Sequence, residues 1–191
     1  MCLSFFLSCR TAARAMSPAR LRIGGSEGDV LCYDVPSFNS TCASMHQNDT
    51  SMCLLMPRFE ALAKFATDSG LDLVFGLNAM WGRANHDEKE PLDFTNIAAL
   101  LRYAAAHDVV LWGLELGNEK CGPPVEVFAA DYKKLQSLLK EIWPEVTKRP
   151  KLIGNDCNTN PKYLAQWLPL LNDSVLDVLT YHRYVRIRNT L

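Results

Sequence analysis

The sequence predicts an α/β fold in which parallel strands alternate with helices. Short apolar runs, which suit buried strands, alternate along the chain with longer segments whose apolar residues recur at helical spacing. Each predicted strand also ends at a polar residue, and in a closed barrel all strand ends converge on one site. No strand leads into a GxGxxG or GxxxxGKS/T loop, so an open nucleotide-binding sheet has no support. We therefore expect an incomplete (β/α)8 barrel, the TIM barrel, with about five parallel strands.

The first third of the chain contains one predicted strand, a long polar segment and one predicted helix. Residues 21–25 are a short β-prone run that ends in two glycines. Residues 27–53 are polar and are expected to form one long loop, either a functional excursion or an insertion. The helix is expected to start near Pro57, a residue favoured in the first turn, and to stop at Gly70.

The central and C-terminal parts repeat the strand–helix unit. Residues 71–77 are the second predicted strand, and Asp93 suits the N-cap of the helix that follows. The apolar run 109–114 is the third strand, and Pro124 precedes the next helix. The last predicted elements are strand 151–154, a helix marked by Tyr163 and Trp167, and strand 175–181. A complete barrel typically needs about 250 residues. The 191 residues are therefore expected to form one partial barrel domain over residues 1–191.

Composition excludes several classes of function. The formal net charge of −1 gives no electrostatic attraction to nucleic acid or anionic membranes. No apolar run approaches the roughly 20 residues of a membrane-spanning helix, so no transmembrane segment is expected. The seven cysteines show no zinc-ligand spacing, and we expect neither a metal nor another cofactor. Cys32, Cys42 and Cys53 lie in one polar region and could include a disulfide pair in a secreted protein.

Two further features bear on location and ligands. Three Asn-x-Ser/Thr sequons, which begin at Asn39, Asn48 and Asn172, favour a secreted or lysosomal protein. The N-terminal apolar patch is too short for a convincing signal peptide. Basic residues cluster at 148–151 and 183–188, where they could contact acidic sugars, but such clusters are more often solvated surface.

Glu119 is the candidate for catalysis. It follows the apolar run 109–114 closely, which places it at the C-terminal tip of a buried strand, where barrel enzymes carry their active sites. There a glutamate can donate a proton to a departing glycosidic oxygen, while the amide of Asn118 orients a sugar hydroxyl. The alternative is that the acid only caps the following helix. The polar residues at the other strand ends are Ser26, Asn78, Asp156 and His182.

Four segments of this sequence resemble the heparanase family, retaining endo-β-glucuronidases built on (β/α) barrels. The segments are 17–25 (SPARLRIGG), 70–79 (GLDLVFGLNA), 115–119 (ELGNE) and 180–184 (TYHRY). They occur in the order of the family and with connections of similar length, and the resemblance covers roughly residues 11–184. The second and third segments together are the specific part of this resemblance.

The resemblance implies an arrangement of the active site and a class of substrate. It makes Glu119 the general acid/base of a retaining mechanism and Asn118 its substrate-orienting neighbour. The residues implied to form the wall around the sugar are Ser26, Asn78, Asp156, His182 and Tyr184. The implied substrate is a β-linked polysaccharide that contains uronic acid, such as a glycosaminoglycan.

Two departures from the family pattern bear on activity. Lys120 replaces the proline that usually follows the acid, and a cation there would tend to keep Glu119 ionised. By the same correspondence the chain covers the second to the sixth barrel strand, so the nucleophilic glutamate of the seventh strand has no counterpart. Asp156 is the best substitute, whereas Glu126 and Asp131 are expected to face solvent from a helix. The alternative hypothesis is a non-catalytic, truncated relative that at most binds carbohydrate.

Overall fold

The main sheet of the protein is parallel throughout. The computed structural model describes residues 3–36, 52–154 and 160–182, and for residues 3–8 it describes the backbone alone. Over these residues the sheet has the strand order β1-β4-β5-β6-β7, and all four strand pairs are parallel. The strands are β1 (Ala19–Ile23), β4 (Leu71–Leu77), β5 (Gly113–Leu116), β6 (Lys151–Gly154) and β7 (Val178–Leu179). The predicted five parallel strands are therefore confirmed.

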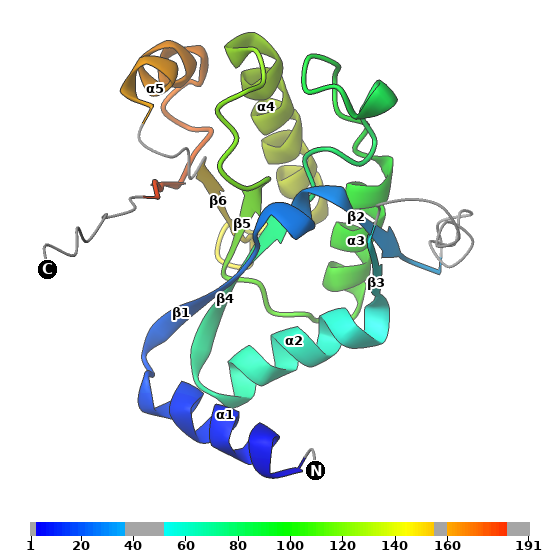
Figure 1. The fold of residues 1–191 in the computed structure, drawn as a ribbon, viewed down its shortest axis with the longest axis vertical. Coiled ribbons are helices and arrows are strands. Elements are labelled where there is room, and N and C mark those ends of the chain that lie inside the picture. Colours follow the sequence, from blue (N-terminus) through cyan, green and yellow to red (C-terminus); the bar gives the residue numbers. More distant parts are fainter. Residues whose placement is uncertain (1–2, 37–51, 155–159, 183–191) are drawn as a thin grey trace, which may run out of the picture.

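An α-helix lies in each connection between successive strands of this sheet. The helices are α2 (Met56–Asp68), α3 (Thr95–Ala106), α4 (Val125–Ile142) and α5 (Pro161–Trp167), and the 3-10 turn η4 (Leu168–Leu170) extends α5. Figure 1 shows that the sheet curls and that these helices lie on its outer side. The strands and helices meet through a continuous apolar core, in which Leu114, Phe128 and Trp167 have no exposed surface. Curling of the sheet and alternation with helices confirm the incomplete (β/α) barrel.

A second, two-stranded parallel sheet lies outside the barrel pattern. It pairs β2 (Leu31–Asp34) with β3 (Met52–Leu55), and β2 follows the 3-10 turn η1 (Ser26–Val30). The predicted polar loop 27–53 thus contains regular structure, although residues 37–51 lie outside the described part. Tyr33 explains the position of β2, because its ring is fully buried and its N–H and C=O both bond the side-chain amide of Asn96 on α3.

Two of the three cysteines considered for a disulfide face each other across this small sheet. Cys32 and Cys53 are register partners in β2 and β3, and neither forms a disulfide. The third, Cys42, lies outside the described residues. Cys121, after β5, is disulfide-bonded.

The chain begins with a helix that the sequence did not predict, α1 (Leu3–Ala15). Its guanidinium groups hold it to the C-terminal end of α2, because Arg10 pairs with the Asp68 carboxylate at 3.3 Å and Arg14 Nε donates to the Asp68 carbonyl at 3.2 Å. Cations suit this position, since the last carbonyls of a helix carry partial negative charge. Within the described residues, no helix has both the length and the apolarity needed to cross a bilayer.

Candidate active site

Glu119 lies at the C-terminal end of β5, where the sequence predicted it. Its backbone is left-handed, with φ of 53°, and 27% of its side chain is exposed. Glu119 Oε1 lies 2.7 Å from Nδ1 of His182, which follows the end of β7 by three residues. Strands β5 and β7 are not neighbours, since β6 lies between them, so the contact joins side chains across the open end of the sheet. Two of the residues predicted for the site therefore meet.

Asn118 is held by a cation from β1. Arg22 Nη2 donates to Asn118 Oδ1 at 3.1 Å, and Arg22 Nε donates to the carboxylate of Glu115, which is buried in β5. A guanidinium has only donors, so the atom of the amide that faces it must be the oxygen. The amide nitrogen of Asn118 is thereby turned away from Arg22. Gly24 leaves room for this arrangement, because a Cβ there would lie 3.1 Å from Arg22 Cζ.

Sequence reasoning missed both Arg22 and Glu115. Each lies between two apolar residues of a strand, Arg22 within Leu-Arg-Ile and Glu115 within Leu-Glu-Leu. A charged residue at a strand centre is rarely buried unless it is paired. That pattern was the available signal, but only the sheet order shows that the two charges face each other.

Asp29 in η1 connects the ends of β4 and β5. Its carbonyl accepts hydrogen bonds from the backbone N–H groups of residues 79, 80 and 81, at 3.2, 2.9 and 3.3 Å. Its carboxylate accepts from Asn118 N at 2.8 Å and pairs with Lys120 Nζ at 3.0 Å. Burial raises the pKa of the Asp29 carboxyl above its ordinary value, against the opposing effect of Lys120. Lys120 also pairs with Glu88 at 2.9 Å, so two carboxylates balance the cation that was expected to act on Glu119.

Asn78 is fully buried at the end of β4. Its backbone N–H donates to the hydroxyl of Tyr33 at 2.8 Å, and burial raises the pKa of that hydroxyl. Its amide side chain lies against the same Tyr33 hydroxyl, and it makes no other hydrogen bond within the described part of the chain.

The remaining predicted wall residues divide into two groups. Ser26 is exposed at the start of η1 and makes no hydrogen bond to Glu119, Asn118 or Asn78 in the described structure. Asp156 and Tyr184 lie outside the described residues. The structure thus brings Glu119, Asn118 and His182 to one end of the sheet, with Asn78 at the tip of the strand next to β5.

The prediction that Asp131 faces solvent was wrong. Its side chain is only 6% exposed and pairs with Arg83 Nη2 at 2.6 Å, in an ion pair whose arginine has no exposed side-chain surface. Burial raises the pKa of the Asp131 carboxyl, and Arg83 acts in the opposite direction. The pair anchors the loop after β4, which contains the 3-10 turn η3 (Ala84–His86), to helix α4. Glu126 on α4 is exposed, as expected.

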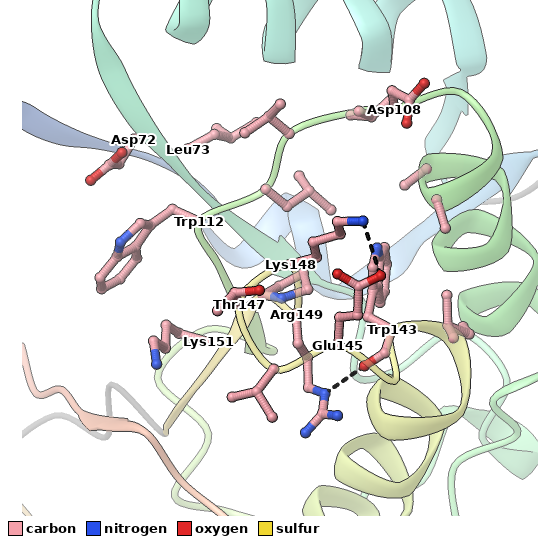
Figure 2. Close-up of a pocket in the computed structure, with 18 of the residues that line it drawn as sticks. Asp72, Leu73, Asp108, Trp112, Trp143, Glu145, Thr147, Lys148, Arg149 and Lys151 are labelled. Carbon is pink, nitrogen blue, oxygen red and sulfur yellow. Dashed lines mark hydrogen bonds and ion pairs between the residues drawn. The ribbon is translucent and has the colours of Figure 1, made fainter.

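A cavity away from Glu119 lies at the other end of the strands. Figure 2 shows this cavity, of about 880 Å³, which is lined by the first residues of β4 and β6 and by the loop after α4. The basic cluster at its rim is engaged locally: Lys148 pairs with Glu145 at 3.0 Å, and Arg149 donates to the carbonyl of Trp143 at 2.8 Å. This agrees with the interpretation of the cluster as solvated surface. The described residues contain no group of three or more His, Cys, Asp or Glu side chains that could hold a metal ion.

A partial parallel barrel whose polar residues gather at the C-terminal strand ends has the arrangement of (β/α)-barrel enzymes, whose active sites lie at that face. The sequence profile of glycosyl hydrolase family 79, N-terminal domain, matches residues 6–186, and the chain belongs to this family.

Curated relatives agree with this assignment. Heparanase-like protein 1 of Arabidopsis thaliana is 31% identical over 189 residues, which cover 91% of this chain and 35% of the relative. Baicalin-beta-D-glucuronidase of Scutellaria baicalensis is 26% identical and covers 92% of this chain and 38% of its own length. Heparanase of Bos taurus is also 26% identical, with coverage of 92% and 40%. The chain thus spans little more than a third of the length of the relatives it matches.

Proposed function

We propose that this chain supplies the acid/base part of the active site of a retaining glycosidase that cleaves β-linked, uronic-acid-containing polysaccharide. The observation that carries the proposal is the contact between Glu119 and His182 at the open strand ends. A retaining acid/base must donate a proton in the first step and accept one in the second. The His182 ring contacts Oε1 of Glu119 at 2.7 Å while 27% of the Glu119 side chain stays exposed, so the carboxyl is oriented yet accessible for both steps.

Asn118 has the second role in the proposed mechanism. Because Arg22 binds its oxygen, its amide nitrogen can donate to a sugar hydroxyl beside the bond that breaks.

The nucleophile of the proposed mechanism comes from polypeptide outside this sequence. A retaining pair requires a second carboxylate about 5–5.5 Å from the acid/base. Glu115 and Asp29 are poor candidates, because Arg22 and Lys120 hold them in ion pairs. The uronic-acid preference is supported by the names of the relatives, of which two contain heparanase and one glucuronidase.

The test compares wild type, Glu119→Gln and Glu126→Gln in the complete gene product on an aryl β-D-glucuronide. We expect Glu119→Gln to lower kcat/KM by about 10²–10⁴-fold, the usual contribution of a general acid. Glu126 is an exposed glutamate on the next helix, so Glu126→Gln should retain activity. Equal rates for the wild type and Glu119→Gln would remove Glu119 from the mechanism. No turnover of any glucuronide or uronic-acid polysaccharide by the wild type would favour the non-catalytic, carbohydrate-binding alternative.

We also propose a secreted or lysosomal location. Asn172 of the third sequon is exposed, and its side-chain oxygen accepts a hydrogen bond from Ser174 at 3.0 Å, so the acceptor site is open to a glycosyltransferase. The first two sequons lie outside the described residues.

A further inference from the structure

Three loops at the open strand ends meet in one cluster of charges. Lys120 follows β5, Asp29 lies in η1, and Glu88 lies between η3 and α3. Lys120 Nζ is 3.0 Å from Asp29 Oδ2 and 2.9 Å from Glu88 Oε1. We refer to these three residues as the Lys120 triad. Their side chains are 13%, 7% and 32% exposed, respectively, so water screens the triad only in part.

The triad holds the residues on both sides of Glu119. Asp29 Oδ1 accepts from the backbone N–H of Asn118, and Asp29 Oδ2 pairs with the ammonium of Lys120. Glu119 lies between these two anchors and has the left-handed backbone that L-residues seldom adopt. Such a conformation persists only where the surrounding contacts enforce it. One carboxylate therefore fixes the chain immediately before and immediately after the proposed acid.

Packing around the triad leaves little room for movement. A Cβ added to Gly117 would lie 2.7 Å from Ala79 Cβ, 2.8 Å from Lys120 Cγ and 3.2 Å from Asp29 Oδ1. Gly117 also has a positive φ of 77°. The loop after β5 therefore lies directly on the triad and on the residue that follows Asn78.

The positive charge of Lys120 also persists. Burial alone would lower the pKa of Lys120, but Asp29 and Glu88 outweigh burial and the pKa is raised above its ordinary value. The ammonium thus stays protonated over the range in which glycosidases work. Its two partners sit on separate loops, so the cation ties η1 and the β4–α3 loop to the loop that carries Glu119.

We propose that Lys120, Asp29 and Glu88 are positioning residues that hold the backbone of residues 118–120 and thereby aim Glu119 at the leaving oxygen. The inference rests on the proposed function for its catalytic part. Its structural part, the restraint of the Asn118–Lys120 backbone, stands without it.

The first test measures backbone hydrogen exchange at Asn118, whose N–H bonds Asp29. The variants are Lys120→Met, Lys120→Arg and Glu88→Gln, with Lys148→Met as the control, since Lys148 forms an exposed pair with Glu145 at the opposite end of the strands. We expect exchange at Asn118 to accelerate at least tenfold in Lys120→Met, less in Glu88→Gln, and not at all in Lys148→Met. Lys120→Arg should restore protection. Unchanged exchange in Lys120→Met and Glu88→Gln would overturn the proposal, and Glu88→Gln decides the matter if Lys120→Met does not fold.

The second test uses two aryl β-D-glucuronides, one with a good and one with a poor leaving group, in the complete gene product. A displaced acid matters most where the leaving group needs a proton. We expect Lys120→Met to lower kcat/KM at least tenfold for the poor leaving group and less than threefold for the good one. Equal losses on both substrates would indicate a general structural defect and refute the positioning role. If the wild type cleaves neither substrate, the proposed function fails, while the exchange measurement still decides whether the triad restrains the loop.

Discussion

Arg83→Met should be among the most destabilising substitutions in the loop that follows β4. The Arg83 side chain has no exposed surface. It donates to the carbonyls of Ala79, at 2.6 Å, and of Glu90, and it pairs with Asp131 at 2.6 Å. Methionine keeps much of the apolar stem but leaves a buried carboxylate without a counter-charge and two carbonyls without their donor.

The magnitude follows from the burial of the pair. Removing one partner of a buried ion pair costs about 3–5 kcal/mol, because the other charge stays buried and uncompensated. For a domain of 150–250 residues, 1 kcal/mol shifts Tm by about 2–4 °C, so we expect Tm to fall by about 6–20 °C. Arg102→Met is the matched control, since Arg102 and Glu141 are 56% and 64% exposed. An exposed pair contributes about 0–1 kcal/mol.

The pH dependence provides a second measure of the same effect. Burial already raises the pKa of the Asp131 carboxyl, and loss of Arg83 would raise it further. A carboxyl whose pKa is higher in the folded than in the unfolded state binds its proton more tightly when folded. Stability then falls as pH rises between the two pKa values, so the deficit of Arg83→Met should be smaller at pH 5 than at pH 8.

Urea unfolding followed by circular dichroism measures the free-energy deficit of each variant and its change between pH 5 and pH 8. A deficit for Arg83→Met no larger than that for Arg102→Met would refute the reasoning about the buried pair. A deficit that grows as pH falls would show that Asp131 is not the group left uncompensated.

Three further predictions concern the site and its surroundings. Arg22→Met should lower kcat/KM on a β-glucuronide about 10–100-fold, because the amide of Asn118 loses its orientation. This loss is the equivalent of one charged hydrogen bond. Steady-state kinetics would contradict the prediction if kcat/KM stayed within twofold of the wild type. Gly117→Ala should destabilise the fold by about 1–3 kcal/mol in urea unfolding, because the new methyl would lie 2.7 Å from Ala79 Cβ and φ is positive. A change below about 0.5 kcal/mol would show that the loop accommodates the methyl without strain. Protein expressed through the secretory pathway should lose one glycan in Asn172→Gln, seen as a mobility shift against wild type after electrophoresis, and an unchanged mobility would show that this sequon is not used.

The strand pattern was predictable where local signals were strong. Residues 71–77 and 151–154 coincide with β4 and β6, because apolar runs there are followed at once by polar residues. The run 109–114 predicted β5 less well, since pairing with β4 begins only at Gly113. Strands β2 and β3 were missed because each is only four residues long and their position depends on contacts with α3, which local sequence does not reveal.

The error at Asp131 could have been avoided from periodicity alone. Asp131 is three residues after Phe128 and four before Leu135, and both of these are buried on the inner face of α4. An aspartate on that face required a buried partner of opposite charge. Arg83, in the loop after β4, was the candidate. By contrast, the contact of Glu119 with His182 depends on how the sheet curls. The sequence predicted that their strands end at one edge, but the distance between the side chains follows only from the three-dimensional arrangement.

The carboxylates around the end of β5 differ in the kind of basic side chain that each one faces. The pairs are Arg22 with Glu115, Lys120 with Asp29, and His182 with Glu119. Guanidinium and ammonium groups keep their protons at neutral pH, so the first two pairs fix geometry and exchange no proton. Histidine is the one side chain of these three types that gains and loses a proton near neutral pH. In the proposed mechanism proton exchange occurs at Glu119, while Asp29 holds the backbone of Asn118 and Glu115 holds the arginine that binds its amide.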